Sequence, residues 1–145
     1  MSAVSRWVCD ARGGAENVLV RALVGPVFLS EGVVEKFLFS DALGAGRFAK
    51  IGIPFPTESA PLVGVVEIVA GTLLTLGLLS RLAAVLLLVD TSVAIVTTKV
   101  PMLGAKAPWA TANEARTDWA MLFGLLFLLA AGGGRRSVDA QIARR

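Results

Sequence analysis

Long apolar segments, separated by short polar stretches, run through most of the chain. Four of them approach the roughly 20 residues that a helix needs to cross a hydrocarbon layer about 30 Å thick. No segment shows a continuous charged face of the kind that a helix of a soluble bundle turns toward water. The pattern predicts an all-α fold, an antiparallel membrane four-helix bundle with both termini on the same side. The four predicted spans are residues 18–40, 61–79, 82–98 and 113–131.

A cleaved signal peptide is the alternative interpretation of the first span. Gly25 and Pro26 interrupt its apolar run, and the Glu, Lys and Phe residues that follow form no small-x-small cleavage site. We therefore expect this segment to remain as a helix, with a kink at Pro26 that neighbouring helices in a membrane accommodate.

Turn-forming residues separate the predicted spans. Residues 41–60 contain enough glycine and proline to exclude a continuous helix. Only Ser80 and Arg81 lie between the second and third spans, which predicts a tight antiparallel hairpin. The chain then divides into a cytoplasmic N-terminal arm (1–17), a four-transmembrane-helix domain (18–131) and a cytoplasmic basic tail (132–145).

The last span has recognisable signals at both ends. Thr111-Ala-Asn-Glu114 fits a capping box, in which the Thr hydroxyl and the Glu carboxylate satisfy free backbone amides. This places the start of the helix near Ala112. The run of glycines that begins at Gly132 stops a helix well.

The distribution of Lys and Arg predicts the orientation, because cytoplasmic loops carry an excess of both. With four crossings, the side that holds both termini has eight such residues and the other side has five. We therefore expect both termini in the cytoplasm of a bacterial-type cell. The eight are Arg6, Arg12, Arg21, Arg81, Arg135, Arg136, Arg144 and Arg145; the five are Arg47, Lys50, Lys99, Lys106 and Arg116.

Composition excludes several kinds of chemistry. Hydrophobic residues make up 55% of the 145-residue chain, and there is no His and only one Cys, Cys9. A chain without His has no bis-His haem site and no Ser-His pair, and one thiol forms neither a disulfide nor a C-x-x-C motif. No metal-site spacing is present, and a net charge of +3 without a basic stripe predicts no nucleic-acid partner. We expect membrane lipids as partners and no activity of the chain alone.

Charged residues nevertheless occur inside the predicted spans. A lone charge at the centre of a membrane helix costs roughly 2.5–3.5 kcal/mol on insertion scales, so such groups need a partner, a proton or water. With the expected topology most of them meet in the outer half of the bundle. Lys36 with Glu67 is the first pair expected from depth, and Lys99 with Glu114 or Asp118 is the second. The predicted polar cluster, which can also bind a ligand, is Glu31, Glu35, Lys36, Glu67, Asp90, Lys99, Glu114 and Asp118.

Small residues share the faces on which these charges lie. Gly64 and Gly71 flank Glu67 at helical spacing, and Gly25 and Gly32 form a stripe with Lys36. Small residues allow membrane helices to approach closely, so these four glycines are predicted helix-packing positions. Two interpretations of the charges stay open: a polar clasp that fixes helix register, and an outward-open cavity for a small ligand, a proton path or a partner segment.

Three segments resemble the DoxX family of small membrane proteins. They are EGVVEKF (31–37), GVVEIVAGTLLTLGLLSRLAA (64–84) and GGGRRSVDA (132–140). The chain departs from the family pattern at Glu31, where relatives often have His, and at Gly133, where Pro is common. The features that match best are Gly32, Lys36, Glu67, Gly71, Gly77, Arg81, Ser137 and Asp139.

The resemblance implies a four-helix membrane protein associated with membrane redox systems, including thiosulfate:quinone oxidoreduction and complexes that handle oxidative and thiol stress. It leads us to expect an accessory or structural subunit that binds other membrane-protein subunits as partners, or a lipophilic ligand such as a quinone. No covalently bound cofactor is expected. The alternatives are a proton-coupled transporter or catalytic subunit that uses Glu67 and Asp90, and a membrane chaperone.

Overall fold

The computed structural model describes residues 14–105 and 108–143, and within these ranges the fold contains helices and no strand. The predicted all-α class is therefore confirmed for the described residues. Residues 1–13 of the expected N-terminal arm, with Cys9, lie outside them, as do Lys106, Arg144 and Arg145. In chain order the helices are α2 (Glu16–Ser30), the π-helix η1 (Glu31–Leu38), α3 (Ala45–Lys50), α4 (Pro56–Leu76), α5 (Ser80–Ala94), the π-helix η2 (Ile95–Lys99), α6 (Val100–Ala105), α7 (Pro108–Glu114), α8 (Arg116–Ala131) and α9 (Val138–Ala143).

Three continuous helical stretches of the described chain are long and apolar enough to cross a membrane. They are Glu16–Leu38, Pro56–Leu76 and Ser80–Gly104, with mean hydropathies of 1.5, 1.8 and 1.8. The first continues through Pro26 and changes to π winding at Glu31. The helix in the fourth predicted span, α8, has 16 residues.

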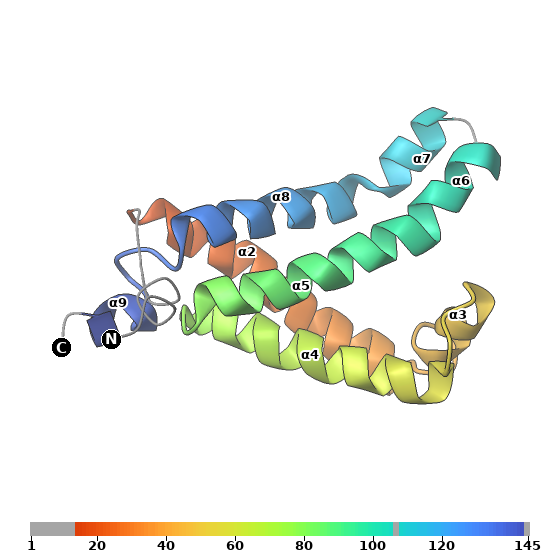
Figure 1. The fold of residues 1–145 in the computed structure, drawn as a ribbon, viewed down its shortest axis with the longest axis horizontal. Coiled ribbons are helices and arrows are strands. Elements are labelled where there is room, and N and C mark those ends of the chain that lie inside the picture. The colour runs from red at the N-terminus through yellow and green to blue at the C-terminus, as the bar shows by residue number, and fades with distance from the viewer. Residues whose placement is uncertain (1–13, 106–107, 144–145) are drawn as a thin grey trace.

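In Figure 1, α2, α4, α5 and α8 run along the length of the molecule. α2 packs on α4, α4 on α5, and α5 on α8. α9 lies at one end, here called the α9 end, and α3 lies at the other, called the α3 end, together with α6 and α7 (Figure 1). The core between the helices contains Val24, Leu74, Leu87, Leu125 and Leu128, all without solvent exposure.

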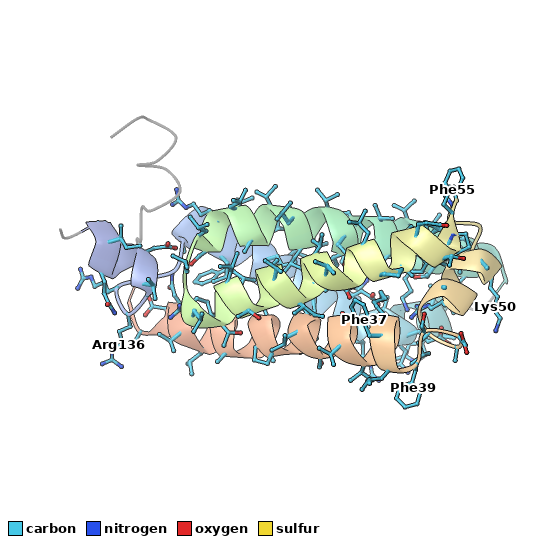
Figure 2. All side chains as sticks on the ribbon, turned by 90° about the horizontal axis from the view of Figure 1, so that it is seen from below. Phe37, Phe39, Lys50, Phe55 and Arg136 are labelled. Carbon is cyan, nitrogen blue, oxygen red and sulfur yellow. The ribbon has the colours of Figure 1, made fainter. Side chains whose placement is uncertain are left out.

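Apolar side chains also cover the outside of the bundle, as expected where the surroundings are lipid. Leu19, Val65, Val89 and Phe123 are all more than 45% exposed. In Figure 2 side chains project outward along the whole length, and Phe39 and Phe55 point away from the bundle at the α3 end. Because no continuous polar face is present on these helices, the outer surface supports the membrane location.

The turn between α4 and α5 lies three residues earlier than the sequence predicts. Gly77 and Leu79 adopt the left-handed conformation, with φ of 71° and 49°. Ser80 and Arg81, expected to form the turn, lie in the first turn of α5 instead. The left-handed Gly77 ends α4, as glycine commonly does after a helix.

The predicted start of the last helix is wrong. Thr111 lies inside α7, and its hydroxyl donates to the Met102 carbonyl oxygen at 3.3 Å instead of capping a helix. The chain bends at Ala115, and α8 begins at Arg116. The capping-box pattern failed because α7 packs beside α6, which offers the hydroxyl a nearer acceptor.

The segment after α8 folds back onto the α4–α5 turn. Asp139 is 1% exposed, and its carboxylate accepts hydrogen bonds from Leu79 N at 2.7 Å, Ser80 N at 2.9 Å and Ser80 Oγ at 2.8 Å. Asp139 N in turn donates to the Gly77 carbonyl oxygen at 3.0 Å. Asp139 therefore supplies, from a distant part of the chain, the cap that α5 lacks locally.

Glycines bring α2 and α4 into backbone contact. A Cβ atom at Gly71 would lie 2.8 Å from the Gly25 carbonyl oxygen, and one at Gly32 would lie 2.8 Å from the Gly64 carbonyl oxygen. The structure thus places all four glycines of the predicted packing stripes between α4 and the continuous helix formed by α2 and η1, where no side chain has room.

We expect Gly71→Ala to destabilise the protein by about 1–3 kcal/mol, because the backbone of α2 cannot move away without disturbing the core. Gly104→Ala is the matched control, since a Cβ there meets nothing within 4 Å. Unfolding by sodium dodecyl sulfate, followed by circular dichroism, measures both. Equal stability of the two variants would contradict the close contact.

We expect Asp139→Ala to destabilise the protein by about 2–4 kcal/mol, because it leaves buried amides of the α5 N-terminus without acceptors. Asp41→Ala, at an exposed position, is the control and should change stability by less than about 0.5 kcal/mol. Thermal unfolding in detergent compares them. If Asp139→Ala unfolds at the wild-type temperature, the C-terminal segment does not stabilise the hairpin.

Candidate functional site

A cavity of about 410 Å³ lies between the helices toward the α3 end. Its walls come from α2 and η1, from α3 and the loop after it, from α4, from α5 and η2, and from α8. Six of the eight residues of the predicted polar cluster line it. The charged lining residues are Glu31, Glu35, Lys36, Arg47, Glu67, Asp90 and Asp118.

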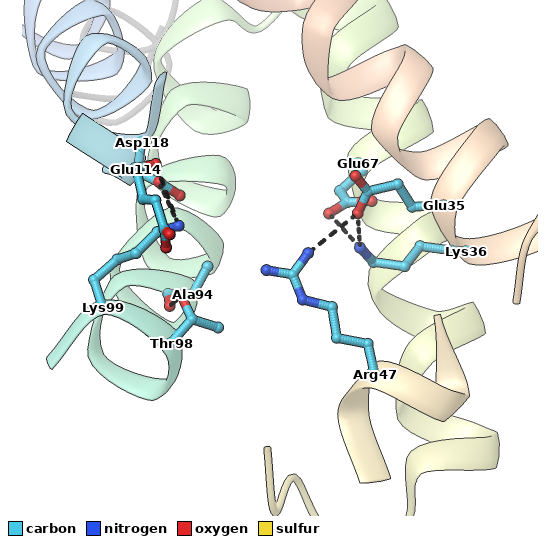
Figure 3. A network of polar contacts seen from close by, with 9 residues as sticks. All are labelled: Glu35, Lys36, Arg47, Glu67, Ala94, Thr98, Lys99, Glu114 and Asp118. Carbon is cyan, nitrogen blue, oxygen red and sulfur yellow. Dashed lines mark hydrogen bonds and ion pairs between the residues drawn. The ribbon is translucent and has the colours of Figure 1, made fainter. Parts of the chain in front are cut away.

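Lys36 is the centre of one charged group in this cavity. It is 7% exposed, and its Nζ lies 3.6 Å from Glu67 Oε1 and 3.5 Å from Glu35 Oε2 (Figure 3). The same ammonium lies 5.5 Å from the centre of the Phe48 ring, within the range of a cation–π interaction. Lys36 and Glu67 thus form the pair that the expected helix depths predict.

Arg47 belongs to the same group, although the sequence assigned it only to a loop. It lies on α3, and its Nη1 is 3.8 Å from Glu35 Oε2, so Glu35 lies between two cations. Figure 3 shows the guanidinium pointing from α3 toward the glutamates. Nothing in the local sequence signals this contact, because it depends on α3 folding back over the mouth of the bundle.

Lys99 and Asp118 form a second charged group on the opposite wall (Figure 3). Lys99 Nζ lies 3.3 Å from Asp118 Oδ2 and donates to the backbone carbonyl oxygen of Glu114 at 3.4 Å. Lys99 therefore pairs with the carboxylate of Asp118, one of the two proposed for it. Lys99 and Glu114 do not line the cavity.

The π winding of η1 explains why Glu31, Glu35 and Lys36 all face the cavity. In an α-helix, at about 100° per residue, Lys36 would lie about 140° from Glu31 around the axis. A π-helix has about 4.4 residues per turn, which reduces that angle to about 50°. The hydrogen bond from Phe39 N to the Val34 carbonyl oxygen, at 2.9 Å, shows this i to i−5 pattern.

The cavity has few donors and many acceptors. Only Lys36 and Arg47 among its charged lining residues are cations, against five carboxyl groups. On η2, the hydroxyls of Thr97 and Thr98 donate to carbonyl oxygens of their own helix, at 2.8 Å and 2.6 Å, so toward the cavity they present acceptor oxygens. Oε2 of Glu67, a residue only 3% exposed, has no hydrogen-bond partner among the described residues. A ligand that accepts at one end and donates at the other would complement this arrangement.

The glycine contacts support this site directly. A Cβ atom at Gly64 would lie 2.6 Å from Lys36 Cβ, and one at Gly32 would lie 3.1 Å from Glu67 Cβ. The two side chains of the central pair therefore emerge from a point where the helix backbones nearly touch. Larger residues at either glycine would separate the ammonium from the carboxylate.

A second polar layer lies at the α9 end, and its side chains bond to backbone carbonyl groups instead of to one another. Asn17 Nδ2 donates to the Gly132 carbonyl oxygen at 2.9 Å, Arg21 Nη2 to that of Arg136 at 3.0 Å, and Arg81 Nη2 to that of Ala130 at 3.1 Å. These side chains satisfy carbonyl groups at and beyond the end of α8, as basic groups near a helix C-terminus do. The layer holds the C-terminal segment in place, and its three side chains are not among those that line the cavity described above.

We expect Lys36→Met to destabilise the protein by about 3 kcal/mol, because it leaves the buried Glu67 carboxylate without its cation. Lys50→Met, at an exposed position of α3, should have no measurable effect. The double variant Lys36→Met/Glu67→Leu should recover to within about 1 kcal/mol of wild type, since apolar replacements of a buried pair are often neutral. Detergent unfolding measures all three, and a double variant no more stable than Lys36→Met would rule out the pairing.

Comparisons with known proteins give a consistent family. The family model described as DoxX matches residues 17–100, more than half of the chain. A Mycobacterium tuberculosis protein described as an uncharacterized membrane protein is 50% identical over 152 residues, covering 99% of this chain and 93% of its own. No solved structure matches the chain. The match spans α2 to η2, a range that contains most of the residues lining the cavity, and the chain belongs to the DoxX family of membrane proteins.

Proposed function

We propose that this protein is an accessory subunit of a membrane redox complex and that its cavity holds the headgroup of a quinone. The observation that carries the proposal is the unequal distribution of donors and acceptors around the cavity. The Lys36 ammonium and the Arg47 guanidinium donate from one wall and suit the carbonyl oxygens of a quinone. On the wall formed by α5, η2 and α8, the carboxylates of Asp90 and Asp118 and the Thr oxygens suit the hydroxyl groups of the reduced form.

The chemistry of electron transfer would then come from a partner protein. The chain has no His and a single Cys, so its own side chains offer neither a haem site nor a dithiol pair. Carboxyl groups, an ammonium and a guanidinium bind and orient a ligand and hold protons near it. This division of roles fits an accessory subunit in a larger assembly.

The proposal places the protein in the cell membrane as a four-helix bundle with both termini in the cytoplasm. α8 would be the fourth crossing: its 16 residues span about 24 Å, and α7 extends it toward the far surface. The start of α2 and the segment after α8 are hydrogen-bonded together at the α9 end, which supports a common side for both. The α3 end, with the cavity, would face outward.

A proton-coupled transporter is less compatible with the packing. Between the cavity and the α9 end, the helices pack tightly through apolar side chains. These are Val24, Phe28, Leu74 and Leu87, which are at most 3% exposed. This apolar layer separates the cavity from the polar layer at the α9 end. A route for protons would need polar groups or water through it.

Titration of a decyl-substituted benzoquinone into the protein in nanodiscs, followed by calorimetry, tests the proposal. We expect saturable binding, and we expect Arg47→Met to weaken it about 10–100-fold, since a hydrogen bond to a charged group contributes about 1.5–3 kcal/mol. Lys50→Met on the same helix is the control, because Lys50 points away from the bundle (Figure 2). Binding that does not saturate, or that both variants share equally with wild type, would refute the quinone site.

A further inference from the structure

We infer that the cavity opens sideways into the lipid between η1 and α8, so that its ligand is a membrane-borne molecule whose apolar tail leaves through this slot. The inference rests on the proposed function for the headgroup, and it adds the route and the class of ligand. It starts from the point where α2 and α8 approach each other. A Cβ atom at Gly124 would lie 2.8 Å from Val24 Cγ2 and 3.7 Å from Val20 Cγ1.

Beyond that point the two helices separate. In Figure 1, α8 and the helix formed by α2 and η1 diverge toward the α3 end, while η1 stays packed on α4 and α8 on α5. Two helical turns further along, the residues in register are Glu31 on η1 and Thr117 on α8. Both line the cavity, and Thr117 is exposed. The proposed slot therefore lies between these two residues.

The depth of the slot in the membrane determines whether it opens to water or to acyl chains. At about 1.5 Å per residue, Val24 lies about 12 Å from the start of α2, and Glu31 lies about 22 Å from it. A hydrocarbon layer about 30 Å thick, measured from the same start, includes both positions. The slot between them thus faces acyl chains, while its rim carries a carboxyl and a hydroxyl that suit a polar headgroup.

On the side of the cavity opposite the slot, the α4–α5 hairpin closes the cavity toward the α9 end. These helices are joined by the turn at Gly77–Leu79 and pack directly on each other. Val93 of α5 lines that side and is 48% exposed, so it provides a second position for comparison. A tail leaving on this side would pass Val93 and not Thr117.

Two probes with the same benzoquinone headgroup, one with a decyl tail and one without, test the inference in nanodiscs. We expect Thr117→Trp, which fills the slot, to weaken binding of the tailed probe at least tenfold more than binding of the tailless probe. Val93→Trp, which also lines the cavity, should change binding of the two probes by the same factor. Leu126→Trp, on the opposite face of α8 from Thr117, is the control for an added indole and should affect neither probe.

The outcomes distinguish failure of the slot from failure of the quinone site. If the tailless probe binds and Thr117→Trp leaves the tailed probe unaffected, the slot is overturned while the quinone site stands. The slot is also overturned if Val93→Trp selectively weakens the tailed probe, or if Thr117→Trp weakens both probes equally. If neither probe binds wild-type protein, the quinone site and the slot fail together.

Discussion

The contact between the backbones of α2 and α4 sets the geometry of the rest of the molecule. Gly25 faces Gly71 and Gly32 faces Gly64, so no side chain separates the helices. This close approach lets Lys36 and Glu67 meet while both remain buried. It also turns the polar face of η1 toward the interior, where α5 and α8 complete the enclosure. A bilayer supplies no water to such groups, so the charged layer depends on the glycines behind it.

Polar side chains at the two ends of the bundle make different kinds of contact. At the α9 end, Asn17, Arg21 and Arg81 donate to backbone carbonyl groups. At the α3 end, charged side chains face one another across a cavity, and the buried Oε2 of Glu67 has no hydrogen-bond partner within the described chain. The first arrangement holds the C-terminal segment against the bundle, although Nε and Nη1 of Arg21 have no hydrogen-bond partner among the described residues. The second differs because its charged side chains line a cavity, where a ligand can reach them.

Sequence reasoning succeeded where the signal is local or depends only on depth. Hydropathy located three spans, because a continuous apolar run is sufficient evidence for a membrane helix. The meeting of Lys36 with Glu67 followed from the similar depth of the two residues in adjacent antiparallel helices. What could not be predicted depends on contacts made by the folded chain. Arg47 reaches the site only because α3 folds back, and the π winding of η1 has no clear sequence signature. The Thr111 capping pattern was misleading because a carbonyl group of another helix competes for the hydroxyl.

The bond between Asp139 and the start of α5 has a consequence for biosynthesis. Ser80 and its acceptor are separated by 59 residues, so α5 leaves the ribosome long before its cap exists. During translation the hairpin of α4 and α5 forms without the Asp139 carboxylate as an acceptor for the amides of Leu79 and Ser80. The carboxylate can dock and fix the hairpin only after Asp139 has been synthesised. A chain truncated before Asp139 therefore lacks the cap of α5.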